Sequence, residues 1–533
     1  MDNSAQTKLL KEQLTDTSAG RSATISEQIV ELATASCELF TDLDGKPFAS
    51  FHGNSGEQQT YAIYSKTFKL TLGFWYYQAT KKTAKQEHLK DALEALASTA
   101  RYAGTTQPVY TRVAHHEGAI YVDLSNDQWQ VIKVDATGWI VLDISPVKFI
   151  RTDAMRSLPV PTTGGDINNL WSFVNVPEKD RLLVLAWMVE ALRPETQKPI
   201  LEILGSHGTG KSHTSSIIRS LIDPNKALLR ALPKSIDDLY VTAAANWVLT
   251  SENVSHLPER YQDAMCQIST GTGYAKRELY SDGNEVTFEV KRPQIVNGIT
   301  PLATRQDMAD RTVSITLPLI PRDQRQNDKG IKADFKKAYP ELFGALLEIL
   351  AKSLDILSEI QLEQLPRLAD FGILGEAVGR VMGTPGVFND LFFENQKELA
   401  LNALDSCPAA MALIALCNQS TNTIVFTGTV GQLFNTVESY KGNDFEGWPK
   451  SPKGFSNAIK RQSAALAMIG ISFTFHKRGN SGIPVTVTKQ ITQPDSLSTH
   501  HTQQISTDSE HSEPRELEST AVSDNDDLTE MVI

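Results

Sequence analysis

The sequence predicts an α/β protein with a central strand–loop–helix core, an N-terminal β-rich α+β domain and a C-terminal helical region that ends in a small helix-and-ribbon domain. Three observations predict this arrangement. Residues 200–222 contain an apolar run, a glycine-rich turn and an amphipathic helical pattern, in that order. Short β-prone runs separated by turn residues recur through residues 48–142. A helical pattern followed by two strands around a basic turn lies within residues 455–488.

The glycine-rich turn matches a phosphate-binding loop. Gly205, Gly210, Lys211 and Ser212 fill every fixed position of the pattern G-x-x-x-x-G-K-S/T. Glycine lets the backbone adopt positive φ and bring successive N–H groups close to phosphate oxygens, while the helix that starts near Lys211 adds the positive end of its dipole. The lysine supplies charge to the β- and γ-phosphates, and the serine hydroxyl is a ligand for Mg²⁺.

The core is therefore predicted to be a P-loop NTPase with ATP and Mg²⁺ as cofactors. The predicted nucleotide-binding residues are Gly205, Ser206, His207, Gly208, Thr209, Gly210, Lys211, Ser212 and His213.

Charge is distributed unevenly along the chain. The whole sequence has a formal net charge of -12, but residues 494–533 carry ten acids and one base, so the remaining residues are nearly neutral. A nearly neutral protein can still carry a local basic surface, and global charge neither supports nor excludes DNA binding. No run of about 18 apolar residues occurs, and the start of the chain lacks a basic segment followed by an apolar block. We therefore expect a cytoplasmic protein that does not enter a membrane.

The chain begins with a polar segment, residues 1–24, that is predicted to be disordered. Residues 25–158 are predicted to form the β-rich α+β domain, with helices at 26–39 and 83–103 and short strands at 48–52, 58–64, 109–114, 119–123, 129–134 and 139–142. Asp42, Asp44 and His52 imitate the carboxylates and histidine of a primase site. Because Asp44-Gly45 is a hairpin turn signal, we reject the primase interpretation.

The P-loop core is predicted to cover residues 167–360. After the phosphate loop, residues 246–253 form an apolar run that ends in Glu252 and Asn253. A carboxylate at the carboxyl end of a strand beside the phosphate loop can hold the magnesium shell and polarise the attacking water. Glu252 is therefore the candidate catalytic acid and, with Ser212, a candidate metal ligand. The alternative is an exposed glutamate in a turn.

Residues 293–297 form another apolar run, which ends in Asn297. This is the position of a side chain that senses the γ-phosphate, and Arg305 and Arg311 follow shortly afterwards. In a ring-forming ATPase an arginine at this place stabilises transition-state charge on the nucleotide of the neighbouring subunit. We favour Arg311 over Arg305 as this arginine finger, and local salt bridges are the alternative for both.

A hairpin is predicted around Asp282-Gly283-Asn284, because Asp-Gly-Asn lies between alternating residues. Lys276, Arg277 and Tyr280 precede its tip, and Lys291 follows it. Cations together with an aromatic ring suit phosphate contact plus base stacking, so these four residues are the candidate DNA contacts. A solvated hairpin explains the same composition equally well.

The last part of the chain is predicted to contain three regions. Residues 361–440 have a helical pattern, and residues 441–490 combine a helix with a basic two-stranded ribbon, which is typical of a winged-helix domain. The alternative for this domain is an α/β cap with a structural role. Residues 494–533 are predicted to be an acidic disordered tail.

Taken together, these motifs resemble a known group of proteins. The core from Gly205 to Leu317 is similar to the superfamily-3 helicases and poxvirus-type primase-helicases among the AAA+ ATPases. Residues 26–488 resemble a family of ATP-binding helicase-like proteins encoded on bacterial mobile elements. The segments that carry the resemblance are Gly205–Ser212, Trp247–Pro258, Thr270–Tyr280, Arg292–Arg311 and Trp448–Phe455. Relatives have Asp-Asn at the strand end, where this chain has Glu252-Asn253.

The resemblance implies a homo-oligomer, a hexameric ring, that threads single-stranded DNA past the hairpin, with a primase or other replication factors as possible partners. We therefore predict an ATP hydrolase that acts as an ATP-dependent DNA motor, a replicative DNA helicase of a plasmid, prophage or integrative element. The alternative is a non-processive ATPase switch that controls a DNA-bound initiator or antiphage complex.

Overall fold

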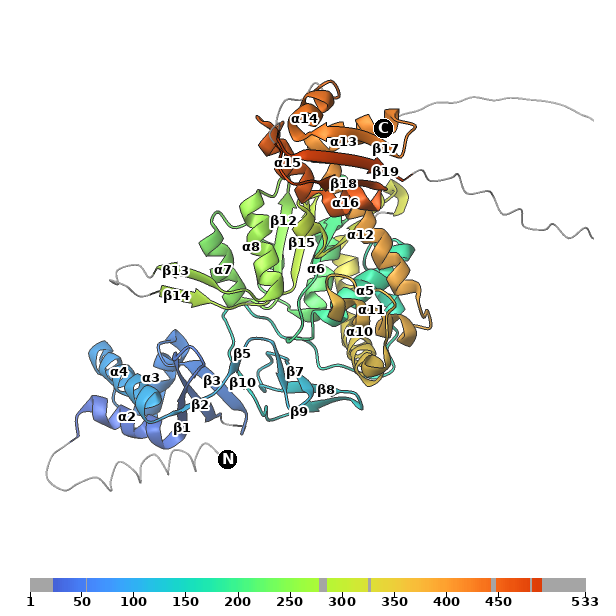
Figure 1. Cartoon of the computed structure of the whole chain (residues 1–533). Coiled ribbons are helices and arrows are strands. Elements are labelled where there is room, and N and C mark those ends of the chain that lie inside the picture. Colours follow the sequence, from blue (N-terminus) through green and yellow to red (C-terminus); the bar gives the residue numbers. More distant parts are fainter. Residues whose placement is uncertain are drawn as a thin grey trace, which may run out of the picture. The chain divides into compact units, whose positions relative to one another are not determined.

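The structure is a computed structural model that describes residues 23–53, 55–277, 285–324, 327–441, 447–479 and 482–490 (Figure 1). Several sequence predictions lie outside these described residues. They are the disordered segment at residues 1–22, the turn Asp282-Gly283-Asn284, Tyr280 and the acidic tail at residues 494–533.

The N-terminal part of the chain forms a small α/β unit with its own core. Its sheet has the order β3-β2-β1-β4, and a cluster that includes Phe51, Phe68 and Leu96 fills the space between the sheet and the helices. The carboxylate of Asp42 accepts the N–H groups of Asp44 and Lys46, which confirms the hairpin turn predicted at this point. The elements are α2 (Ile25–Ser36), β1 (Cys37–Thr41), β2 (Pro47–His52), β3 (Gln58–Ala62), α3 (Lys66–Thr80), α4 (Gln86–Tyr102) and β4 (Thr105–Thr106).

A second antiparallel sheet follows, with the order β6-β7-β8-β9. Val122, Ile132 and Val134 on one face of this sheet belong to the same apolar cluster as the central core, and β8 and β9 contact α10 (Asp328–Ile356). Residues 25–158 therefore do not share one core: the first sheet has its own cluster, one face of the second sheet joins the core of the central domain, and a small cluster that includes Tyr121, Val131 and Phe149 is separate from both. The elements are β5 (Val109–Tyr110), β6 (Val113–His116), β7 (Ala119–Asp123), β8 (Val131–Asp135), β9 (Gly138–Leu142) and β10 (Lys148–Phe149), of which β5 pairs with β10.

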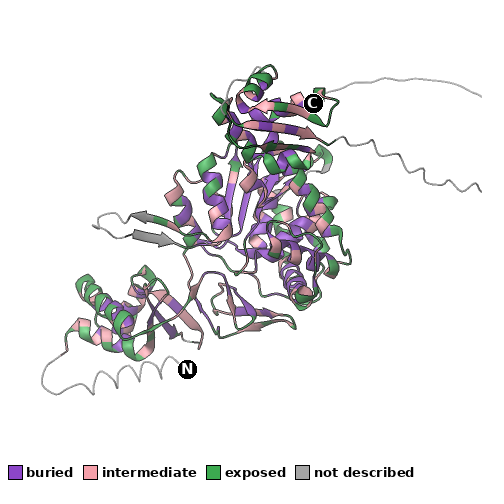
Figure 2. Ribbon diagram, in the orientation of Figure 1, coloured by how far each residue is buried: buried purple, intermediate pink, exposed green. Residues whose placement is uncertain are grey.

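The central domain is built on a parallel sheet with the order β12-β15-β11-β16. Apolar side chains of α5, α6, α10 and α11 cover one face, and those of α7, α8 and α9 cover the other. The strands are consequently buried between two helical layers, as Figure 2 shows, which is the usual arrangement of a parallel sheet. The remaining elements are η1 (Ile167–Ser172), η2 (Glu178–Asp180), α5 (Arg181–Glu190), β11 (Ile200–Leu204), α6 (Lys211–Ile222), α7 (Ile236–Ala245), β12 (Leu249–Val254), α8 (Glu259–Thr270), β13 (Tyr274–Arg277), β14 (Glu285–Phe288), β15 (Gln294–Gly298), α9 (Gln306–Ala309), β16 (Thr312–Thr316), η3 (Arg322–Gln324), η4 (Leu357–Glu359) and α11 (Ala369–Val381).

The C-terminal part has a separate apolar core and an antiparallel sheet with the order β17-β19-β18. Strand β17 and helix α14 belong to this unit, although the sequence placed both in the preceding helical region. The unit therefore begins near residue 408 instead of 441, because β17 completes its sheet. The elements of this unit are α13 (Pro408–Gln419), β17 (Ile424–Thr429), α14 (Val430–Glu438), α15 (Pro452–Arg461), α16 (Ser463–Met468), β18 (Ile471–Phe475) and β19 (Pro484–Lys489), and α12 (Val387–Asp405) precedes it.

Within the described ranges, no single helix has the length and apolar composition needed to cross a bilayer. Only α12 and α13 together pass that test, and the chain bends by 101° between them.

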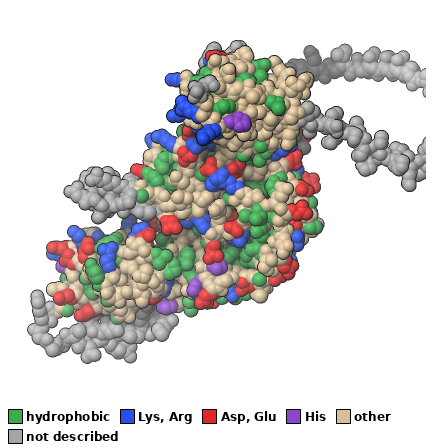
Figure 3. All heavy atoms as spheres, viewed as in Figure 1, with side chains coloured by type: hydrophobic (Ala, Val, Ile, Leu, Met, Phe, Trp, Pro, Cys, Tyr) green, Lys and Arg blue, Asp and Glu red, His purple; other side chains and the backbone are tan. Residues whose placement is uncertain are grey.

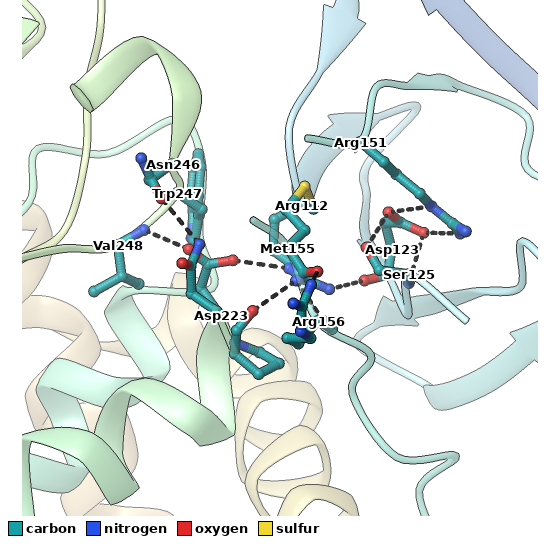
Figure 4. Close-up of polar contacts among 12 residues, drawn as sticks. Arg112, Asp123, Ser125, Arg151, Met155, Arg156, Asp223, Asn246, Trp247 and Val248 are labelled. Atoms are coloured by element: carbon teal, nitrogen blue, oxygen red, sulfur yellow. Dashed lines mark hydrogen bonds and ion pairs between the residues drawn. The ribbon is translucent and has the colours of Figure 1, made fainter. Parts of the chain in front are cut away.

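A buried arginine joins the second sheet to the central domain (Figure 4). Arg112, between β5 and β6, is completely buried, and its Nε donates to Oδ1 of Asp223 at 3.0 Å. Its other nitrogens donate to the backbone oxygens of Asp123, Arg156 and Pro224. The second carboxylate oxygen of Asp223 accepts the N–H of Val248 at 3.0 Å. One carboxylate therefore fixes the end of α6, the approach to β12 and the second sheet.

We expect Arg112→Ala to destabilise the protein by about 3–5 kcal/mol, because it leaves the buried Asp223 carboxylate with a poorly placed cation, the Arg219 guanidinium at 3.8 Å. Urea denaturation measures the change. Arg156→Ala is the matched control, since Arg156 is exposed and its guanidinium donates to two nearby backbone oxygens. Equal losses for the two variants would contradict the structural role assigned to Arg112.

Candidate nucleotide-binding site

The candidate site lies at the carboxyl edge of the parallel sheet. The parallel register places Ile203 opposite Asn297 and Leu204 opposite Gly298, while Ser251 lies opposite Val296. The loop after β11, Glu252 near the end of β12 and Asn297 near the end of β15 therefore share one edge. Ligands of open α/β sheets bind at this edge, where the loops that follow the strands meet.

The loop of residues 205–210 has the backbone that its glycines predict. Gly205, Gly208 and Gly210 have φ angles of 152°, 84° and 79°. A Cβ atom at position 205 would lie 2.7 Å from the Thr209 hydroxyl oxygen, so a side chain there would collide with the loop itself. That hydroxyl donates to the backbone oxygen of Ser206 at 3.0 Å and closes the loop. Ser206 and His207 are exposed at its outer surface.

Lys211 is the first residue of α6, and its ammonium is held by the loop. Nζ donates to the backbone oxygens of Gly205 at 2.7 Å and Ser206 at 2.9 Å. The residue is only 8% exposed, and burial lowers the pKa of Lys211. Ser212 follows in the same helical turn and is half-buried. The cation is thus already positioned where the loop backbone would meet a phosphate.

His213 and Asn175 fix the loop from outside. His213 Nε2 donates to the backbone oxygen of Phe173 at 3.0 Å, so this ring connects α6 to the segment that follows η1. The side-chain amide of Asn175 donates to the backbone oxygens of Thr209 at 3.0 Å and Pro318 at 2.7 Å. The sequence analysis did not select Asn175, because an isolated asparagine between apolar residues gives no motif.

Asn297 connects three elements of the site. Its side-chain oxygen accepts the N–H of Asn253 on β12 at 2.8 Å, and its amide nitrogen donates to the Ser215 hydroxyl on α6 at 3.1 Å. Asn297 is 1% exposed. A shift of α6 would therefore move Asn297 and change its hydrogen bond to Asn253 at the end of β12. Ser215 was also missed in the sequence, since its partner is distant along the chain.

Glu252 lies where β12 departs from regular pairing with β15. The register shifts between Ser251 and Val254, and Asn253 has φ 53°. The Glu252 N–H donates to the backbone oxygen of Arg230 at 2.8 Å, and the residue is partly exposed. The strand thus places a carboxylate at the site edge beside Asn253.

Glu202 on β11 is a further polar residue that the sequence analysis missed. Its carboxylate accepts the N–H groups of Leu302 at 2.7 Å and Ala303 at 3.1 Å and the Ser314 hydroxyl at 2.5 Å. Burial raises the pKa of Glu202, while these hydrogen bonds act in the opposite direction. An acid inside the apolar run of residues 200–204 was the available signal, because buried acids are rare unless they are paired.

Arg305 and Arg311 lie on the connection between β15 and β16, and Arg311 is distant from the glycine-rich loop of residues 205–210 in its own chain. The backbone oxygen of Arg311 accepts the N–H of Ile200, which is the first residue of β11. Five residues of extended strand, about 16 Å, therefore separate Arg311 from Gly205. Arg311 is paired with Asp307 at 2.6 Å and its side chain is 13% exposed, whereas the Arg305 side chain is 32% exposed.

Arg305 is also ion-paired, with Asp263 at 3.1 Å and Glu259 at 3.6 Å. The local salt bridges considered in the sequence analysis are thus present for both arginines. The guanidinium groups of both arginines are held by acids of α8 and α9.

The candidate DNA contacts are only partly described. Strands β13 and β14 pair as a two-stranded ribbon that extends from the central domain in Figure 1. Tyr274 at its base stacks on Tyr240 of α7, with ring centroids 4.2 Å apart. The side chains of Lys276 and Arg277, as well as Tyr280, lie outside the described residues.

The cations after the ribbon have structural contacts. The Lys291 ammonium donates to the backbone oxygen of Glu195. The Arg292 guanidinium lies 5.2 Å from the Trp247 ring centroid and donates to the backbone oxygens of Ala243 and Asn246. Burial lowers the pKa of Arg292 to about 10.

The fold and this edge define a mixed α/β protein with a glycine-rich loop, an acid and an asparagine brought together by neighbouring parallel strands. Residues 167–384 match the family model of the actinomycete integrative conjugative element replication protein, and residues 409–503 match that of the AICE RepA C-terminal domain. These two matches assign the chain to the replication proteins of integrative conjugative elements.

Solved structures give weaker similarities. An apo structure of the NrS-1 C-terminal region has 12% identity and a TM-score of 0.38, covering 86% of this chain and 98% of that chain. A second apo structure of that region has 12% identity and a TM-score of 0.37, with coverages of 88% and 99%. A JCV helicase structure with a bound acetamide compound has 10% identity and a TM-score of 0.21, with coverages of 44% and 70%. No curated protein matches the chain.

We expect Asn297→Ala to destabilise the protein by about 1–3 kcal/mol, because the Ser215 hydroxyl and the Asn253 N–H both lose their partner. Thermal and urea unfolding measure the loss. Asn169→Ala, at an exposed position of η1, is the control and should change stability by less than about 0.5 kcal/mol. Indistinguishable unfolding curves for the two variants would remove the linking role of Asn297.

Proposed function

We propose that this replication protein is an ATP-dependent DNA motor, a ring-forming replicative helicase of its integrative element. The observation that carries the proposal is the position of Asn297. This side chain joins the strand of Glu252 to the helix that starts at Lys211, beside a glycine-rich loop with three positive φ angles. Such a connection suits a site that must detect whether a terminal phosphate is present.

The residues at the edge fit ATP and Mg²⁺. The loop backbone can approach an anion closely because a Cβ at position 205 is excluded and positions 208 and 210 have left-handed backbone. Lys211 would contact the β- and γ-phosphates, and Ser212 and Glu252 would hold the magnesium shell. Bound Mg²⁺ would supply a charge that neutralises the phosphoryl group during hydrolysis.

Lys211, Glu252 and Asn297 then have separate roles in the proposed reaction. Lys211 exchanges its two backbone oxygen partners for phosphate oxygens, while Glu252 orients water at the open side of the edge. Asn297 transmits the position of α6 to the end of β12 through Ser215 and Asn253. These contacts couple the occupancy of the loop to the shape of the neighbouring strand.

A ring would give Arg305 and Arg311 a role that a single chain cannot. Both lie on the connection that leads from the carboxyl end of β15 back to the amino end of β16. Arg311 lies about 16 Å along β11 from the phosphate loop. An arginine in this position contacts a nucleotide only if that nucleotide belongs to another subunit. Glu202 supports the arrangement, because it fixes the backbone of Leu302 and Ala303 just before Arg305.

Replacing Lys211 should remove ATP hydrolysis. We expect Lys211→Ala to lower the rate by at least a hundredfold, because the developing phosphoryl charge loses its cation, an effect of about 3 kcal/mol or more. Phosphate release measures the rate, and circular dichroism verifies folding. Lys332→Ala, an exposed position on α10, should retain full activity. Turnover of Lys211→Ala within tenfold of the wild type would refute the ATPase assignment.

Mixing two variants tests the ring. Lys211→Ala lacks an intact phosphate loop, and Arg311→Ala would lack the cation offered to its neighbour. Mixed rings should regain part of the ATPase activity, since some interfaces then combine an intact loop with an intact arginine. Because Arg311 is largely buried against Asp307, the more exposed Arg305 is tested in the same way. Failure of both mixtures, in rings shown by native mass spectrometry to be mixed, would contradict action between subunits.

A non-processive ATPase switch remains the second candidate, and Glu252 favours it. The chain has glutamate where the similar helicases have aspartate, and the longer side chain changes how a magnesium shell would be held. A motor displaces a strand from a forked duplex while DNA stimulates its ATPase. A switch hydrolyses ATP without displacement, so measuring both activities on one preparation distinguishes the two.

A further inference from the structure

The C-terminal unit is basic although the chain is acidic. Residues 409–490 contain eight Lys and Arg residues and three Asp and Glu residues, whereas the whole chain has a net charge of -12. Figure 3 shows Lys and Arg side chains gathered on the side of this unit where Figure 1 places α15. Part of the excess positive charge therefore gathers on the face that Figure 3 shows.

Helix α15 contributes the first part of this surface. Lys453, Asn457, Lys460 and Arg461 are exposed and recur at helical spacing, so they follow one face of the helix. Phe455, Ser456 and Ile459 are buried on the opposite face. The N-cap Ser451 accepts the N–H of Gly454, which fixes the start of the helix. The helix thus presents a polar, cationic face on a firmly packed base.

The turn between β18 and β19 contributes the second part. Lys477 and Arg478 are exposed just after β18. The Lys460 ammonium lies 4.2 Å from the ring centroid of Phe475, which is two residues before Lys477. This contact holds the end of α15 beside the end of β18. We call Lys453, Lys460, Arg461, Lys477 and Arg478 the basic face.

The charges of the basic face are not neutralised within the described ranges, where no carboxylate forms an ion pair with any of its five cations. Arg305 and Arg311 of the central domain, in contrast, are each paired with aspartate. Clustered cations without acidic partners repel one another and bind a polyanion by releasing its counterions. The surface is consequently built for an external anionic partner.

We propose that the basic face binds duplex DNA, with α15 in the major groove and Lys477 and Arg478, just after β18, against a flanking phosphate backbone. The element order α13-β17-α14-α15-α16-β18-β19, with sheet order β17-β19-β18, gives the winged-helix arrangement of a helix beside a two-stranded wing. This duplex site is separate from the single-stranded DNA path of the proposed motor and does not require ATP.

Shape and chemistry favour a duplex over a single strand. Helix α15 has 10 residues and is therefore about 15 Å long, and an α-helix fits the major groove of B-DNA. Single-strand sites use exposed aromatic rings on which bases stack. Among the described residues of the C-terminal unit, no Phe, Tyr or Trp side chain is exposed, and Phe473 and Phe475 pack against each other. Cations without a stacking platform suit the regular phosphate backbone of a duplex.

The test uses the full-length protein without nucleotide and a fluorescent DNA duplex of about 20 base pairs. We expect the triple variant Lys453→Ala, Lys477→Ala, Arg478→Ala to bind the duplex at least about tenfold more weakly at 0.1 M salt. The slope of log affinity against log salt should fall by about 2 to 3 units, because each lost phosphate contact removes about 0.9. The control is Lys332→Ala, Lys336→Ala, Lys352→Ala, which removes three exposed lysines of α10 and should leave both quantities unchanged.

The outcomes separate this site from the proposed ATPase. Duplex binding should survive in Lys211→Ala, so a failed ATPase assignment leaves the duplex site standing. Unchanged duplex affinity and salt slope in the triple variant would overturn the proposal. A loss of single-stranded DNA or duplex RNA binding as large as the loss of duplex DNA binding would also overturn it, because the surface would then be a general polyanion site.

Discussion

The buried ion pair between Arg112 and Asp223 joins three elements on which the candidate site depends: helix α6, the approach to β12 and the second sheet. Asp223 ends the helix that begins at Lys211, and its carboxylate also holds the N–H of Val248 at the approach to β12. Because both charges are removed from water, the loss of either group leaves the other buried with poorer partners, which for Asp223 is the Arg219 guanidinium at 3.8 Å. Asp223 therefore connects helix α6, strand β12 and the second sheet, at a point about 18 Å along α6 from the loop of residues 205–210.

Local sequence patterns correctly predicted those elements in which residue preference and burial favour the same secondary structure. The strand, loop and helix of residues 200–222 were predictable because glycine positions fix the backbone and apolar spacing fixes the helix. Helix α3 was missed, since Phe68 to Tyr77 is rich in aromatic and β-branched residues that favour strands. Burial of Phe68, Leu72 and Tyr76 at intervals of four outweighs that preference. Strand β17 was missed because its partner β19 lies about 60 residues later in the sequence.

The candidate site shows the same division. Lys211, Glu252 and Asn297 could be selected because each ends or follows an apolar strand, and parallel strands bring such ends together. Asn175 and Ser215 could not, since their roles come from contacts with distant segments. The assignment of Arg311 as an arginine finger is still a prediction, whereas Arg292 follows the ribbon in sequence but stacks on Trp247 in space. The turn residues predicted the ribbon, but the sequence could not show which side chains Lys291 and Arg292 would contact.

The two hydrogen bonds between Lys211 and its own loop have a kinetic consequence. The Lys211 ammonium donates to the backbone oxygens of Gly205 and Ser206, so the loop of residues 205–210 folds around its own cation. If the loop binds the phosphates of ATP, as proposed, those phosphates would have to displace these contacts, and the contacts would form again when the nucleotide leaves. The affinity for nucleotide would then be lower than for a lysine without such partners, which suits repeated cycles of binding and release better than long occupancy.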